Sequence, residues 1–194
     1  MFEKGFWLMA IDCLLTFSII ETTIAIGTDI LDKLYEWPES ETGMFVTAPY
    51  LICGLLLIPL GWVVDKYGKR QTVIIVQGII TLSTFFIFLA VPKCHRCSAS
   101  MYPWVFFGFG LTVYYVLMYG SVSYLVRTHQ TGTAYGFITC FQNIGSFFIP
   151  PMISFIHDST MNVNQGYFWT FVSFAILSVL SLCVKISLLR WDAS

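Results

Sequence analysis

The sequence contains very little charge. Only 11% of its 194 residues are Asp, Glu, Lys or Arg, and the net charge is −1, whereas a soluble domain carries about 25% charged residues. It has no basic tract, which argues against nucleic acid as a partner. Apart from one close pair, its six cysteines are scattered through apolar stretches, so the chain is not a small disulfide scaffold.

Motifs of several membrane-protein classes are also missing. An intramembrane serine protease needs a G-x-S-G serine and a histidine inside a span, but Tyr119-Gly-Ser121-Val-Ser123 does not match and every histidine lies at a span edge. The paired Asn-Pro-Ala loops of aquaporins, an arginine-rich voltage sensor and the triple Pro-x-Asp/Glu-x-x-Lys/Arg repeat of mitochondrial carriers are all absent. We therefore expect no enzyme activity, no catalytic residue, no metal and no cofactor.

Long apolar runs are abundant. The chain is 57% hydrophobic and has a mean hydropathy of +0.75. A membrane-spanning helix needs about 20 apolar residues, and six such stretches lie at about 6–26, 43–64, 71–92, 103–126, 133–156 and 167–189. Runs such as LICGLLLIPL do not alternate as barrel strands do. The sequence predicts an all-α polytopic membrane protein with one domain, residues 1–194, made of six transmembrane helices in a lipid bilayer.

The distribution of basic residues predicts the orientation. Six spans place both termini on one side, and the first span is expected to remain as a signal anchor. With cytosolic termini, seven basic residues lie on the cytosolic side and three on the other, as the positive-inside rule requires. The seven are Lys4, Lys66, Lys69, Arg70, Arg127, Lys185 and Arg190, and the three are Lys33, Lys93 and Arg96.

The turn between the second and third spans concentrates charge and glycine. Its residues are Gly61, Asp65, Lys66, Gly68, Lys69 and Arg70. Gly61 is expected to let a neighbouring helix approach and Gly68 to permit a sharp turn. Asp65 is expected to accept hydrogen bonds from a helix N-terminus or from an arginine such as Arg127. The alternative is a simple positively charged interfacial anchor.

The spacing G-x-x-x-D-K-x-G-K-R closely resembles a loop of the major facilitator superfamily, where it recurs between the second and third helices of each six-helix half. In that superfamily the loop joins the two halves in one state and releases them in the other. The resemblance therefore implies a gating role, rather than substrate contact, for Gly61, Asp65, Lys66, Gly68, Lys69, Arg70 and Arg127.

Two further segments, His129–Phe137 and Gln142–Gly145, resemble the eleventh helix in the branch of lysosomal dipeptide transporters. The resemblance covers the chain as a carboxy-terminal half. It implies alternating-access transport of short, cationic peptides or amino-acid-like solutes in a lysosomal or other endomembrane, with the plasma membrane as the alternative. A second six-helix half is required, from a homodimer, a separate chain or a longer chain. The competing hypothesis is a six-helix subunit or fragment that does not transport.

Two acids lie within the first span, where polar residues default to bundle interiors or substrate paths. Asp12 and Glu21 are nine residues apart, which places them on opposite faces of a helix. Asp12 shares its face with Thr16 and Thr23, and this longer polar stripe favours Asp12 as the residue facing a substrate cavity. The alternative is that Asp12 pairs with another helix and Glu21 extends toward the outer surface.

The fourth and fifth spans supply the other candidate substrate residues. The fourth carries one polar stripe, and the resemblance implies that the first and fourth helices line the cavity. Interhelical hydrogen bonding is the alternative role for these side chains. The fifth span carries side-chain carboxamides, which suit a zwitterion or a peptide bond. In the same span, Pro150-Pro151 are expected to break the helix or to be tolerated as a kink. The candidates are Asp12, Thr16, Thr112, Tyr115, Tyr119, Gln142 and Asn143.

Weaker signals lie in the loops on the outer side. Cys94-His95-Arg96-Cys97 supplies at most three metal ligands, so a disulfide or free thiols fit better than zinc. His157-Asp158 could titrate in an acidic lumen. Gly132-x-x-x-Gly136 is typical of a close helix–helix interface.

Overall fold

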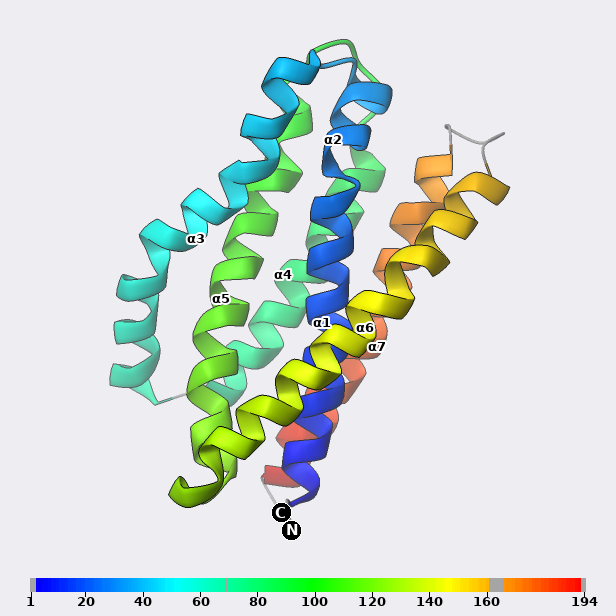
Figure 1. Ribbon diagram of the computed structural model, residues 1–194. Coiled ribbons are helices and arrows are strands. Elements are labelled where there is room, and N and C mark those ends of the chain that lie inside the picture. Colours follow the sequence, from blue (N-terminus) through cyan, green and yellow to red (C-terminus); the bar gives the residue numbers. More distant parts are fainter. Residues whose placement is uncertain (1–2, 69, 161–165, 193–194) are drawn as a thin grey trace.

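The computed structural model describes residues 3–68, 70–160 and 166–192, and within these residues the only regular secondary structure is helical (Figure 1). The predicted gating residue Lys69 lies outside them. The long helices are α1 (Lys4–Ala25), α3 (Glu39–Tyr67), α4 (Arg70–Ala90), α5 (Tyr102–Leu125), α6 (Thr131–Ser159) and α7 (Tyr167–Asp192). The short ones are α2 (Gly27–Asp29), η1 (Ile30–Leu34), η2 (Ser98–Met101) and η3 (Thr128–Gln130). The predicted all-α class is confirmed, and each predicted span falls on one long helix.

Five helices are long and apolar enough to cross a membrane: α1, α3, α4, α5 with η2, and α7. Helix α6, which contains the predicted fifth span, is not among these five described helices. It is long, with 29 residues, but threonines, serines, Gln142 and Asn143 lower its hydropathy. Five of the six predicted spans thus lie on helices that are long and apolar enough to cross a membrane, and the predicted number of six is not confirmed.

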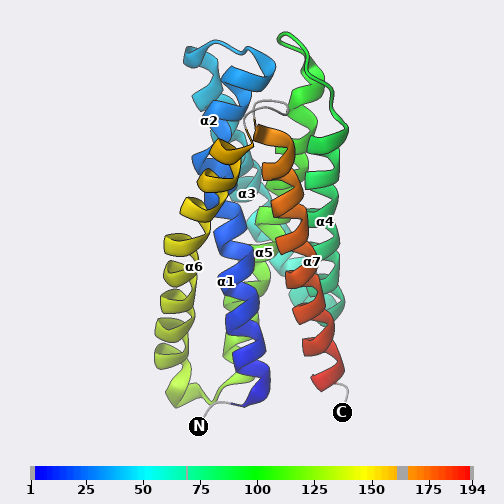
Figure 2. The same cartoon turned by 90° about the vertical axis from the view of Figure 1, so that its right-hand side faces the viewer.

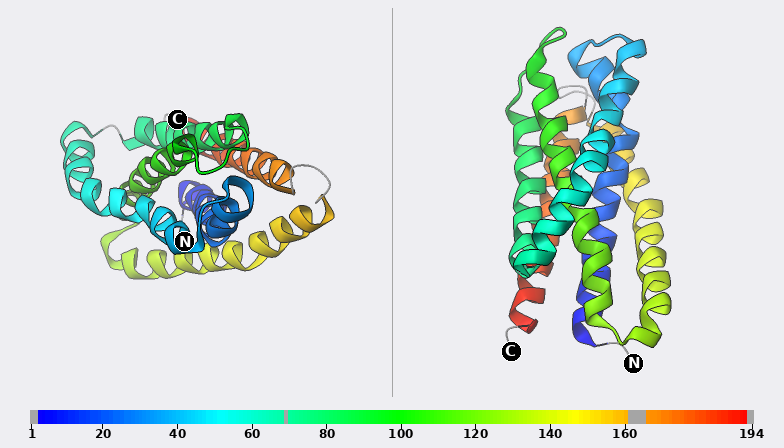
Figure 3. Two further views of the ribbon diagram at one scale, coloured as in Figure 1. Left: turned by 90° about the horizontal axis from the view of Figure 1, so that it is seen from above. Right: turned by 90° about the vertical axis from the view of Figure 1, so that its left-hand side faces the viewer.

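The helices form one bundle in which α1 and α5 are the central elements. Helix α1 packs between α6 and α7, α5 packs between α3 and α4, and α4 packs along α7. Seen from above, these contacts leave α3 and α6 at the two flanks of one side (Figure 3). The chain starts and ends at the same end of the bundle, as an even number of long helices requires (Figure 2).

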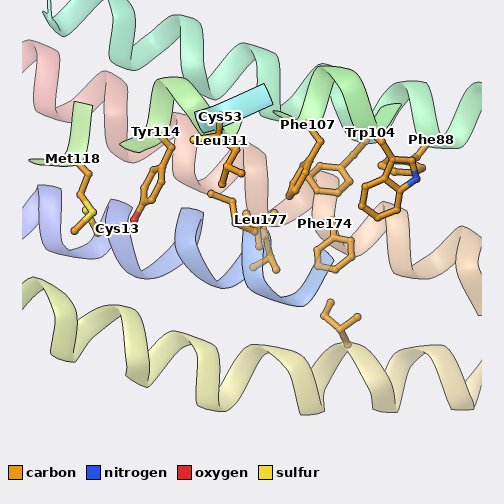
Figure 4. Close-up of a cluster of buried hydrophobic side chains, with 14 of the residues drawn as sticks. Cys13, Cys53, Phe88, Trp104, Phe107, Leu111, Tyr114, Met118, Phe174 and Leu177 are labelled. Carbon is orange, nitrogen blue, oxygen red and sulfur yellow. The ribbon is translucent and has the colours of Figure 1, made fainter. Parts of the chain in front are cut away.

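Aromatic side chains form much of the core between α4, α5 and α7. Phe88 stacks on Phe171 with ring centroids 4.9 Å apart, Phe85 stacks on Phe174 at 5.1 Å, and Trp104 meets Phe88 edge-on at 5.6 Å (Figure 4). Lipid tails are as apolar as these side chains, so close packing rather than removal from water stabilises this contact.

A glycine allows α1 and α6 to cross closely. A Cβ atom at Gly145 would overlap the Ser18 hydroxyl and lie 2.8 Å from the backbone oxygen of Leu14. At Gly61, Gly132 and Gly136, by contrast, a Cβ would meet no other described atom within 4 Å. The expected close neighbour at Gly61 is thus absent from the described bundle, and the predicted Gly132-x-x-x-Gly136 interface is not used within it.

The structure confirms the expected sharp turn at the end of α3 and shows no break in α6. Gly68 ends α3 in the left-handed conformation, with φ of 64°, so the predicted sharp turn is confirmed. Pro150 and Pro151 do not break α6, which continues as one helix to Ser159. Packing against α1 holds this helix together although both residues lack an N–H.

Candidate substrate-facing site and gating loop

The central helices present a face rich in tyrosine on the side flanked by α3 and α6. Tyr115 and Tyr119 of α5 stack with ring centroids 6.4 Å apart, and Tyr119 lies 6.0 Å from Tyr135 of α6. The Tyr135 hydroxyl donates to the backbone oxygen of Tyr119 at 2.5 Å. Glu21 is half-buried on α1 and Tyr50 is 40% exposed on α3, and both helices pack against α5. We call Glu21, Tyr50, Tyr115, Tyr119 and Tyr135 the tyrosine face.

The other acid of α1, Asp12, lies inside the bundle and is ion-paired. Its Oδ1 accepts hydrogen bonds from the Lys185 ammonium of α7, from Ser181 at 2.7 Å and from Thr16 at 3.3 Å. Lys185 also donates to Thr16 at 3.1 Å and to Ser181 at 2.6 Å, so its three N–H donors are all used. With Asp12 8% and Lys185 2% exposed, this cluster links α1 to α7.

The remaining predicted substrate residues lie in two environments. Thr112 is buried and donates to the backbone oxygen of Gly108 at 2.8 Å. Gln142 is buried and donates to the Tyr114 hydroxyl at 2.7 Å and to the Met118 sulfur at 3.2 Å, which links α6 to α5. Asn143 instead lies on the exposed side of α6, where it lines a shallow groove of about 530 Å³. The structure therefore brings Tyr115 and Tyr119 together with Tyr135. It buries the other four candidates inside the bundle: Asp12, Thr16, Thr112 and Gln142.

The predicted gating residues gather at the end of the bundle that carries the termini. Asp65 pairs with Arg70, whose guanidinium lies 4.3 Å from the centroid of the Tyr124 ring of α5. A Cβ at Gly120 would overlap this guanidinium, so the absent side chain makes room for Arg70. Lys66 lies 4.7 Å from the Trp62 ring centroid.

Asp65 pairs with an arginine, which is one of its two expected kinds of partner, but in the described structure this arginine is Arg70 and not Arg127. The turn at Gly68 brings the start of α4 back to the end of α3, so the motif provides its own arginine. Arg127 is exposed between α5 and η3. A cavity of about 710 Å³ opens beside this turn between α4, α5 and α7, with Asp65, Arg70 and Lys185 in its wall.

A comparison with protein families decides what this bundle is. The sequence profile of the Major Facilitator Superfamily matches residues 6–192, nearly the whole chain. The chain belongs to the major facilitator superfamily. This facilitator chain is similar to the lysosomal dipeptide transporter MFSD1 of Gallus gallus, with 26% identity over 190 residues covering 96% of the chain and 39% of that protein. For the Homo sapiens protein of the same name, identity is 25% over 191 residues, covering 97% and 37%. The chain thus spans less than two fifths of the length of these relatives.

Sequence reasoning missed two residues of this facilitator's interior and one of its tyrosine face. Lys185 was counted among the cytosolic residues, but it lies on the buried side of α7. A lysine four residues after Ser181 in a strongly apolar helix is the signal that could have indicated a buried pair. Tyr114 and Tyr50 were not distinguished from the other aromatic residues of their spans, because nothing local marks which way a tyrosine faces.

At the opposite end of the bundle, a disulfide, an ion pair and a hydrogen bond join loop residues. Cys94 and Cys97 form a disulfide, and the intervening His95 pairs with Glu36 at 2.8 Å. Trp37 donates to Ser100 at 3.1 Å, and burial raises the pKa of the nearby Tyr35 to about 12. Among the described residues, no cluster of three or more His, Cys, Asp or Glu side chains could hold a metal ion.

Proposed function

We propose that this chain is one six-helix half of a facilitator that moves a small organic solute, a short peptide or an amino-acid-like molecule, by alternating access. The observation that carries the proposal is the tyrosine face. It is formed by α1, α3, α5 and α6, and Tyr50 and Tyr119 on it are 40% and 55% exposed. Aromatic walls with hydroxyl groups suit solutes that have both apolar and polar parts. The names of the relatives, lysosomal dipeptide transporters, support peptides as the substrate class.

The predicted substrate residues then divide into two roles. Tyr115 and Tyr119 contact the solute. Asp12 and Thr16 hold α1 against α7, and Gln142 holds α6 against α5. Thr112 bonds within α5 and is buried. Asn143 lies on the exposed side of α6 and contributes to contact with another bundle.

A second six-helix bundle covers the tyrosine face in this proposal. The unfilled space at Gly61 of α3 and at Gly132 and Gly136 of α6 supports it, because small residues let helices of another bundle approach closely. The low hydropathy of α6 supports it as well: a sixth span that is covered by protein on both sides needs less apolar surface. Alternating access is the rocking of one bundle against the other around a site near the midplane.

The Asp65–Arg70 pair serves as the gate in this scheme. Its position at the end of α3, which flanks the uncovered side, supports a contact that forms in one state and is released in the other. We place this end, with both termini, in the cytosol. With the buried Lys185 removed from the count, six basic residues remain on that side against three on the other. The relatives' names support a lysosomal membrane.

The test has two steps. Immunoblotting of cells that express the protein, with an antibody to residues 191–194, gives its natural size. A band near twice 22.1 kDa indicates two halves in one chain, and a band at 22.1 kDa requires a homodimer or a separate partner. Uptake of a labelled dipeptide into proteoliposomes that contain the natural assembly then tests transport. Assembled protein that takes up no dipeptide and no amino acid supports the alternative, a six-helix subunit that does not transport.

A further inference from the structure

The cavity beside the turn between α3 and α4 has both polar and apolar walls. Its volume is about 710 Å³, within the range of about 300–1,000 Å³ that is typical of ligand sites. Arg70 and Ser121 line it from the start of α4 and the end of α5, and the buried side chains of Met9 and Leu188 line it from α1 and α7. Such a lining suits a ligand that combines a polar group with an apolar part.

Arg70 brings a guanidinium group to this cavity with most of its donors unused. Among the described residues its one hydrogen-bond partner is Asp65, whereas a guanidinium has five N–H donors. The group is held in place by α5, because it lies against Gly120 and 4.3 Å from the centroid of the Tyr124 ring. Its planar fork suits two parallel hydrogen bonds to the oxygens of one phosphate.

Ser121 adds a buried hydroxyl group to the same wall. The residue is 7% exposed, and its Oγ has no hydrogen-bond partner within the described part of the chain. In the sequence of α5 it follows Gly120 and precedes Tyr124 by three residues, and these are the two residues that Arg70 contacts. An unpaired buried hydroxyl is costly, so a polar partner from outside the chain is expected here.

The first turn of α4 lies at this cavity as well. Gln71 and Thr72 line it, and the first four N–H groups of a helix have no partner within that helix. The preceding residue in the sequence is Lys69, whose side chain contains no acceptor that could cap them. Free N–H groups and the positive end of the helix dipole favour an anion.

The charged groups around the cavity leave Arg70 available to an anion. Asp65 is the only acid among the described lining residues, and its side chain is 66% exposed, so water screens its charge. Lys185 also lines the cavity, but its three donors are already used in the cluster around Asp12. The contacts to an anion therefore come from Arg70, Ser121 and the start of α4.

We infer that this cavity binds a phosphate group, held by Arg70, the Ser121 hydroxyl and the N-terminus of α4. The cavity lies where the membrane-spanning helices α4 and α5 start and end, which is the level of the lipid phosphates in a bilayer. The phosphate belongs to a lipid headgroup or to a free phosphate, since both present the same oxygens to the site. This inference goes beyond the proposed function and does not depend on it, because binding is measured without any transported solute.

The test measures the midpoint of thermal unfolding of the natural protein in a neutral detergent with three probes: dioctanoyl phosphatidic acid, inorganic phosphate and dioctanoylglycerol. We expect a saturating concentration of the phosphatidic acid to raise the midpoint by about 5 °C. Dioctanoylglycerol, which lacks the phosphate, should leave it unchanged. A rise with phosphatidic acid alone identifies a lipid ligand, and a rise with inorganic phosphate identifies a free one. No rise with either phosphate, or an equal rise with dioctanoylglycerol, overturns the inference.

Ser121→Ala is the decisive variant. Without a probe its unfolding midpoint should stay the same or rise, because an unpaired buried hydroxyl is removed. The dissociation constant for the phosphate probe should rise about tenfold, because a hydrogen bond to a charged group is lost. Arg70→Gln should abolish the shift in midpoint. The matched controls Ser187→Ala and Arg190→Gln, which are exposed on α7 outside the lining, should keep it. Wild-type affinity in Ser121→Ala overturns the site even if Arg70→Gln does not fold.

Discussion

The Asp12–Lys185 ion pair puts two charges in the interior of a membrane-embedded bundle, where each is costly alone. The hydroxyls of Thr16 and Ser181 complete the hydrogen bonding, so the cluster carries no unmatched charge. Because its two charged groups come from α1 and α7, it fixes the depth of one helix relative to the other.

Removing one partner leaves the other charge buried and unpaired, which costs about 3–5 kcal/mol in folded proteins. We therefore expect Lys185→Met to lower the midpoint of thermal unfolding markedly, and Asp12→Asn to do the same. The double variant should recover most of the loss, because it leaves no lone charge. Circular dichroism or differential scanning fluorimetry in detergent measures this, and additive losses in the double variant would contradict the pairing.

Local sequence could predict part of this chemistry. Nine residues at 100° each separate the two acids of α1 onto opposite faces, and the structure agrees: Asp12 is buried against α7, while Glu21 is half-buried on the other side. Which of the two faces is uncovered could not be predicted, because the partner of Asp12 lies 173 residues away. A long polar stripe indicates a buried network as readily as a substrate path.

At the scale of helices, α6 has one face that packs within its own bundle and one face that does not. Gly145 and Gln142 face inward, against α1 and α5, and Gly132 and Gly136 face outward with free space around them. One helix thus carries one glycine required by its own bundle and two that leave room for another.

Glycine-to-valine variants distinguish these two faces. Gly145→Val should destabilise the bundle itself, because its side chain would meet Ser18 and the backbone at Leu14. Gly132→Val or Gly136→Val should leave the unfolding midpoint of the bundle nearly unchanged and weaken its association with the second half. Thermal unfolding and cross-linking of the assembly measure the two effects. Equal destabilisation by all three variants would contradict the division.

The turn between α3 and α4 permits a prediction about rates. Asp65→Asn removes the charge that holds Arg70, and Gly120→Val displaces the same arginine from the opposite direction. Both variants should lower kcat for dipeptide uptake several-fold. Asp65→Asn should leave KM nearly unchanged, because in the described structure Asp65 pairs with Arg70 rather than with a residue of the tyrosine face. Gly120→Val tests kcat only, because Gly120 lies next to Tyr119 in the chain. Thr72→Val, which lines the same cavity, serves as the matched control. A large rise in KM with normal kcat would contradict a gating role.

For the molecule as a whole, topology is the property that sequence composition predicts most directly. Apolar runs of sufficient length fix the number of long helices, because lipid offers the backbone no hydrogen bonds outside a helix. The even number then puts both ends of the chain together (Figure 1). Composition alone predicts the environment of α6 and of Lys185 less well, because neighbouring helices rather than lipid or water surround them.

Inserted glycosylation sites test the orientation without interference from natural ones, because the sequence contains no Asn-x-Ser/Thr acceptor. An acceptor inserted in a short spacer between Lys93 and Cys94 should become glycosylated in microsomes. One inserted next to Arg127 should not. The mass shift on a gel, removed by endoglycosidase, is the measurement, and the reverse pattern would place the termini on the lumenal side.

The uncovered tyrosine face has a consequence for the life of the protein in the cell. A half that reaches the membrane ahead of its counterpart shows lipid an acidic side chain, several phenolic hydroxyls and glycine-lined helices. Quality-control machinery in the endoplasmic reticulum recognises polar groups of this kind as the mark of an unassembled subunit. If the proposed second bundle is a separate chain, its supply, rather than synthesis of this chain, sets how much of the protein survives.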